Sequence, residues 1–111
     1  MAKTLTFTFE GKDYTLEYTR EAVKTMERAG FVADDLAQKP MLMFPQLFSY
    51  AFWAHHKYLN GNEIQKIFDR IPNRRELLAR LVEMYREPYE EFMNDPEPED
   101  GEGNVTWTAN F

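Results

Sequence analysis

The chain has 111 residues, which is room for one domain of ordinary size. Its 43% hydrophobic and 15% aromatic residues are enough for a packed core, so a largely disordered chain is excluded despite 29% charged residues. It has no cysteine, which excludes disulfides, thiolate zinc sites and cysteine nucleophiles. The absence of cysteine also favours a reducing cytoplasm, where we expect this protein. No apolar run in it approaches the roughly 20 residues that span a bilayer, so we expect no membrane partner.

The net charge of −6 is unevenly distributed along the chain. Eight of the 19 acidic residues lie from Glu87 onward, where there is no lysine or arginine. The part of the chain before Glu87 is close to charge balance and contains no compact basic patch. We therefore expect no nucleic-acid partner.

The first predicted element is a β-hairpin over residues 4–18. Apolar residues, mostly aromatic, occupy alternate positions in both halves of this stretch, with threonine prominent between them. That alternation is typical of half-buried strands. A short turn over residues 10–13, which contains Gly11, joins the two halves.

A helical region is predicted over residues 19–94. Thr19 is placed to cap its first helix, and Gly30 fits a left-handed stop at the end of that helix. The stretch 41–54 is apolar on nearly every side, which is typical of the buried helix at the centre of a bundle. We expect Pro45 in the first turn of this helix or at a bend.

Two further helices are expected after a short helical turn at 34–37 and the central apolar stretch. The first is amphipathic and ends at Pro72. Asn73 and Glu76 then resemble a capping box for the second, in which Pro88 is expected to cause a kink or a restart. A short apolar face over residues 89–93 closes the helical region.

These elements predict an α+β fold, in which an N-terminal β-hairpin packs on a bundle of about four to five α-helices. We expect residues 1–94 to form a single globular domain. Residues 95–104 are rich in Pro, Gly, Asp and Glu, which is typical of a flexible acidic linker. Residues 105–111 alternate in polarity again and predict a C-terminal strand-like segment.

The C-terminal segment has two interpretations. It can fold back as a third strand on the hairpin, because two strands alone are only marginally stable. Alternatively, it can add a strand to the sheet of a partner, with Val105, Trp107 and Phe111 entering pockets of that partner. The partner in the second case can be another copy of the chain. We name these three residues as the candidate protein-binding residues.

No catalytic, cofactor or metal site is expected. The adjacent pair His55 and His56 points in directions about 100° apart on a helix, so the two rings cannot chelate one ion together. The only serine, Ser49, lies inside the apolar stretch, and the paired acidic residues are adjacent rather than facing. The methionines at 41–44 favour plain core, with a pliable binding surface as the alternative.

Several segments resemble a small phage and prophage family of Gram-positive bacteria that is catalogued as a domain of unknown function. The segments that carry the resemblance are 9–23, 39–41, 51–56, 83–85 and 103–111. Members of that family resemble the tail assembly chaperones of long-tailed phages.

The resemblance implies a non-catalytic morphogenesis factor. Such a chaperone binds the tape measure protein, keeps it soluble during tail morphogenesis and hands over to the tail tube protein. The resemblance also implies a location in the cytoplasm of the bacterial host and absence from the mature virion. Two alternatives are a minor structural tail protein and a small prophage-encoded regulatory or anti-host binding protein.

Overall fold

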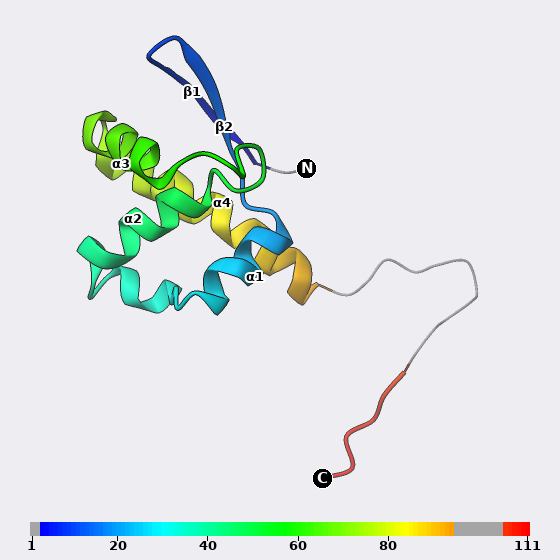
Figure 1. Ribbon diagram of the computed structural model, residues 1–111. Helices are drawn as coiled ribbons and strands as arrows, with labels where there is room; N and C mark the ends of the chain where they lie inside the picture. The colour runs from blue at the N-terminus through cyan, green and yellow to red at the C-terminus, as the bar shows by residue number, and fades with distance from the viewer. Residues whose placement is uncertain (1–2, 95–105) are drawn as a thin grey trace.

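The computed structural model describes residues 3–94 and 106–111 and confirms the α+β class (Figure 1). An antiparallel hairpin is followed by four α-helices, with one 3-10 turn between the first two. The elements in chain order are β1 (Leu5–Phe9), β2 (Lys12–Leu16), α1 (Arg20–Arg28), η1 (Ala33–Leu36), α2 (Pro40–Tyr50), α3 (Gly61–Arg70) and α4 (Arg74–Met93). No helix in the described parts of the chain is long and apolar enough to cross a membrane.

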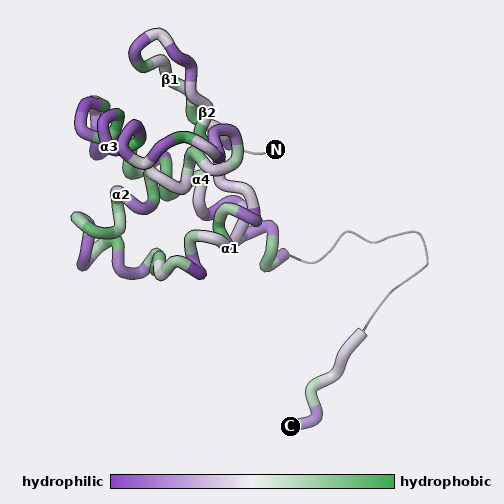
Figure 2. The backbone as a smooth tube through the Cα atoms, in the orientation of Figure 1, coloured by the Kyte–Doolittle hydropathy of each residue, from purple (hydrophilic) through white to green (hydrophobic). Residues whose placement is uncertain are grey.

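The hairpin forms where the alternation predicts it, with Phe7 opposite Tyr14 and Phe9 opposite Lys12. The two residues between the strands, Glu10 and Gly11, both have positive φ (50° and 78°). That geometry matches the right-handed twist of the flanking strands, and glycine adopts it without steric cost. The turn is hydrophilic and lies at the far end of the hairpin (Figure 2).

The core lies where α2 and the turn after it meet the hairpin and the other helices. Aromatic rings connect these parts: Phe52 lies 5.9 Å from Tyr14 of β2 and 5.1 Å from Phe48 of α2, measured between ring centroids. Phe48 in turn lies 5.3 Å from Phe68 of α3. Such edge-to-face and tilted pairs add to the stabilisation from burial alone. The hairpin is therefore attached to the helices mainly through aromatic packing.

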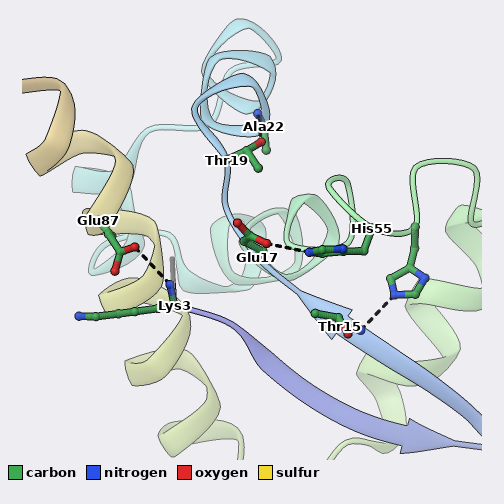
Figure 3. Close-up of polar contacts among 8 residues, drawn as sticks. Lys3, Thr15, Glu17, Thr19, Ala22, His55 and Glu87 are labelled. Atoms are coloured by element: carbon green, nitrogen blue, oxygen red, sulfur yellow. Dashed lines mark hydrogen bonds and ion pairs between the residues drawn. The ribbon is translucent and has the colours of Figure 1, made fainter. Parts of the chain in front are cut away.

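Both ends of α1 confirm the local signals in the sequence. The Thr19 side chain accepts a hydrogen bond from the Ala22 amide at 3.1 Å (Figure 3). At the other end Gly30 has φ of 101°, and the Phe31 amide donates to the Met26 carbonyl at 2.9 Å. This is the left-handed helix stop in which the residue after glycine packs back on the helix. Phe31 is accordingly buried.

The prediction of one helix through residue 54 is wrong, because α2 ends at Tyr50. The backbone after it turns toward β2, and the Ala51 carbonyl accepts a hydrogen bond from the Glu17 amide at 2.9 Å. Pro40 occupies the first turn of α2, and Pro45 lies inside the helix. The carbonyl of Leu47, in the last turn, accepts from the buried Tyr18 hydroxyl at 2.6 Å.

The structure lacks the capping box expected at the start of α4, and of the two possibilities expected at Pro88 it excludes the restart. Asn73 adopts the left-handed conformation with φ of 56°, and its side chain makes no capping hydrogen bond, so the expected capping box does not form. The tight turn between α3 and α4 requires that conformation, which asparagine tolerates better than most residues. The helix does not restart at Pro88, because α4 is continuous from Arg74 to Met93 and buries this proline.

Two histidines in the turn after α2 contact the outer edge of β2. The Thr15 amide donates to Nε2 of His56 at 3.0 Å, and Nε2 of His55 lies 2.7 Å from Oε1 of Glu17 (Figure 3). Partial burial, and then the nearby His55, lower the pKa of His56 from its ordinary value of 6.5. The neutral ring is also the form that can accept from Thr15.

We expect this histidine to make the protein less stable in mild acid. Because the pKa of His56 is lower in the folded than in the unfolded chain, its contribution is complete above about pH 6.5 and is lost as the pH falls below that value. The check is the free energy of unfolding between pH 8 and pH 5 for the native chain and for His56→Gln. The variant should show a shallower decrease, and His55→Gln should retain the larger part of the decrease due to His56, because burial is the first cause of its lowered pKa. An identical pH profile in native chain and His56→Gln would contradict the prediction.

Candidate protein-binding surface

Two of the three residues predicted to bind a partner are exposed in the structure. Trp107 is 84% exposed and Phe111 is fully exposed, whereas Val105 lies outside the described residues. The segment from Thr106 to Phe111 has no regular secondary structure and lies apart from the folded body (Figure 1). Its described residues therefore do not form the third strand of their own hairpin. Two large aromatic side chains remain available to a partner.

A second apolar surface is a groove between α1, η1 and the C-terminal half of α4, which we call the α1–α4 groove. Its wider part is a hollow of about 620 Å³. Phe31 and Tyr85 contribute to this part, with their ring centroids 5.4 Å apart. The apolar residues that line it are Phe31, Val32, Ala33, Leu36, Leu47, Val82, Tyr85 and Tyr89.

The groove continues along α4 into a smaller hollow of about 180 Å³ between α1 and the end of α4. Val23, Pro88 and Phe92 line this part, and Tyr89 lies between the two parts because it lines both. Tyr89 and Phe92 are 56% and 64% exposed, respectively. They are large apolar side chains that face solvent on adjacent turns of one helix.

Charged residues surround the apolar surface of the groove. Arg20 places its guanidinium 5.5 Å from the centroid of the Phe92 ring, a cation–π contact. Glu27 lines both hollows, and Arg86 lines the wider one. Burial, and then the negative charge of Glu27, raise the pKa of Tyr85, which keeps its hydroxyl neutral. An apolar centre with charges of both signs around it matches the chemistry of an amphipathic helix.

A hollow of similar volume on the outer face of α4 is chemically different. It measures about 630 Å³ and is lined mainly by charged residues. Arg80 there pairs with Glu76 at 3.2 Å and with Glu83 at 3.3 Å. In these exposed ion pairs within one helix, the charged groups are already paired with one another. Ala79 and Val82 are the apolar residues in its lining, so this surface offers no large apolar anchor to a partner.

The methionine-rich stretch is divided between core and surface. Met43 is buried, but Met41 and Leu42 are exposed at the start of α2. The prediction of plain core is therefore wrong for Met41, which faces solvent. At the histidine pair, the two rings contact the backbone and side chains of β2 as described above. The described residues contain no group of three or more side chains suited to hold a metal ion.

The groove was only partly predictable from the sequence. The apolar face over residues 89–93 was evident from its spacing, but its exposure was not. Helix α1 has nine residues and α4 has 20, so α1 is too short to cover α4 along its length. The contributions of η1 and of Phe31 depend on the path of the chain after α1. Local signals predicted the stop at Gly30 and the turn near residues 34–37, but not that both would pack beside α4.

The fold and the groove define a small α+β protein with a partly open apolar surface on its helical side. Residues 1–111 match the family described as "Domain of unknown function (DUF5055)", and the chain belongs to this family. No curated protein and no solved structure matches the chain.

Proposed function

We propose that this protein is a phage tail assembly chaperone that binds the tape measure protein and keeps it soluble during tail morphogenesis. The observation that carries the proposal is the α1–α4 groove, which joins an apolar floor to exposed aromatic side chains. A tape measure protein is a long helical protein whose apolar faces aggregate unless they are covered. An open apolar groove with a charged rim is suited to bind successive turns of such a helix.

The groove also suits transient binding better than permanent assembly. Its walls carry charges of both signs, including Arg20, Glu27 and Arg86, so its rim stays compatible with water when no partner is bound. A chaperone must release its client to the tail tube protein. Mixed apolar and charged contacts are typical of interfaces that form and separate.

Co-expression with a tape measure protein encoded in the same genome tests the proposal. We expect the tape measure protein to become soluble and to co-purify with many copies of this chain. The double variant Tyr89→Ser/Phe92→Ser should reduce the recovered complex roughly tenfold, because exposed aromatic anchors carry much of the binding energy in such interfaces. The matched control is Tyr58→Ser, which removes an aromatic ring that is 94% exposed outside the groove.

The outcomes of co-expression, together with the protein composition of purified virions, distinguish the candidate functions. Full binding by the groove variant would assign the client to another surface. Failure of the native chain to bind or solubilise the tape measure protein would overturn the proposed function. Presence of the chain in purified virions would favour the alternative, a minor structural tail protein.

A further inference from the structure

The hairpin has two edges, and only one is covered by described residues. The Glu17 amide, just beyond the end of β2, donates to the Ala51 carbonyl at 2.9 Å, and the Thr15 amide donates to His56 at 3.0 Å. Within residues 3–94 and 106–111, no hydrogen bond joins the outer edge of β1 (Leu5–Phe9) to another part of the chain. A two-stranded sheet is marginal, and an uncovered strand edge is a template for another strand.

The outward-facing backbone groups of β1 follow from the register. Thr15 bonds outward to His56, and its cross-strand partner is Thr6. In an antiparallel pair both residues of such a position point their N–H and C=O groups away from each other. Thr6 and, two residues later, Thr8 therefore present free donors and acceptors. No charged residue or proline lies between Leu5 and Phe9 to block pairing.

The segment Thr106–Phe111 has the pattern that this edge requires. Trp107, Ala109 and Phe111 alternate with polar residues, as Leu5, Phe7 and Phe9 alternate with threonines in β1. The segment contains no charged side chain, glycine or proline. A strand added in matching register places its aromatic rings beside the half-buried Phe7 and its threonines beside those of β1.

We propose that the outer edge of β1 receives residues Thr106–Phe111 of a second copy of this chain. The segment leaves its own hairpin uncovered, although it has the length to reach it. The Lys3 amide donates to Glu87 of α4 at 3.2 Å, so β1 starts beside the C-terminal half of α4 (Figure 3). The twelve residue steps from Asn94 to Thr106 can extend about 40 Å. A second copy within that distance can exchange segments reciprocally, which closes a symmetric dimer.

The test combines sedimentation equilibrium with amide hydrogen exchange on the full chain. We expect the native chain to form a dimer and Trp107→Ser/Phe111→Ser to weaken dimerisation at least roughly tenfold, without a comparable loss of melting temperature. The amides of Thr6 and Thr8 should exchange at least roughly tenfold more slowly in the dimer than in the monomeric variant. Tyr58→Ser, which removes an exposed ring elsewhere, should dimerise like the native chain.

Other outcomes overturn the proposal. If the native chain stays monomeric at millimolar concentration, no second copy binds the outer edge of β1. Protection of Thr6 and Thr8 in a monomer would assign the segment to its own hairpin. Loss of the dimer in the variant without any change at these two amides would place the segment on another surface, such as the α1–α4 groove. None of these results depends on whether the tape measure protein is the client.

Discussion

Phe52→Ala is expected to lower the free energy of unfolding by about 3–5 kcal/mol, the usual cost of removing a buried phenylalanine ring. Phe52 is 1% exposed and packs against Phe7, Tyr14 and Phe48. It belongs to the turn after α2, so one side chain joins the hairpin to the helices. Alanine leaves a cavity between the hairpin and the helices, and neither part can fill this cavity by moving alone.

Urea denaturation followed by circular dichroism measures this loss. The matched control is Tyr58→Ala, an aromatic truncation six residues away at a site that is exposed. That change should stay within about 0.5 kcal/mol, as is usual for surface substitutions. Because domains of this size are stable by only about 5–15 kcal/mol, the Phe52 variant should already be partly unfolded on mild heating. A loss no larger than that of the control would contradict the assigned role of Phe52.

Tyr18→Phe is expected to cost about 1–3 kcal/mol, although it removes a single oxygen atom. The buried Tyr18 hydroxyl donates to the Leu47 carbonyl at 2.6 Å. That carbonyl lies in the last turn of α2, where backbone acceptors lack helical partners. Phenylalanine fills nearly the same volume but removes the hydroxyl that donates to this carbonyl.

The effect of pH provides a second readout for Tyr18. Burial, and then the proximity of Tyr85, raise the pKa of Tyr18 well above its ordinary value of 10.0. Folding therefore favours the neutral hydroxyl, and this contribution is complete below about pH 10 and is lost as the pH rises further. Tyr18→Phe should show a smaller loss of stability at alkaline pH than the native chain.

Tyr14→Phe is the control for Tyr18→Phe. Tyr14 is also buried, but its hydroxyl makes no hydrogen bond within the described residues. Removing that hydroxyl should change the free energy of unfolding by less than about 0.5 kcal/mol. Equal losses for the two variants would show that the contact with Leu47 contributes nothing specific.

The elements with strong local signals were predictable from the sequence. The alternation in residues 4–18 predicted the hairpin, because side chains on a strand point to alternate faces. Thr19 and Gly30 predicted the two ends of α1, since both act on backbone groups within one helical turn. The α+β class followed from these two patterns together.

The wrong predictions share a physical cause. Local pattern alone predicted a longer α2, but the Ala51 carbonyl bonds to Glu17, which is 34 positions away along the chain. Asn73 was expected to cap α4 through its side chain, but the turn from α3 requires its left-handed backbone. In both cases a contact or constraint from another element outweighed the local preference.

The sequence by itself determined the hairpin, the first helix, the apolar centre of the bundle and the alternation in the C-terminal segment. Only the tertiary structure decided which apolar faces remain in water. The α1–α4 groove lies where α1, η1 and α4 meet without filling the space between them, and the outer edge of β1 is open because the turn after α2 covers β2 instead. The exposure of a surface depends on which distant parts of the chain pack against it, and a local pattern contains no information about that packing.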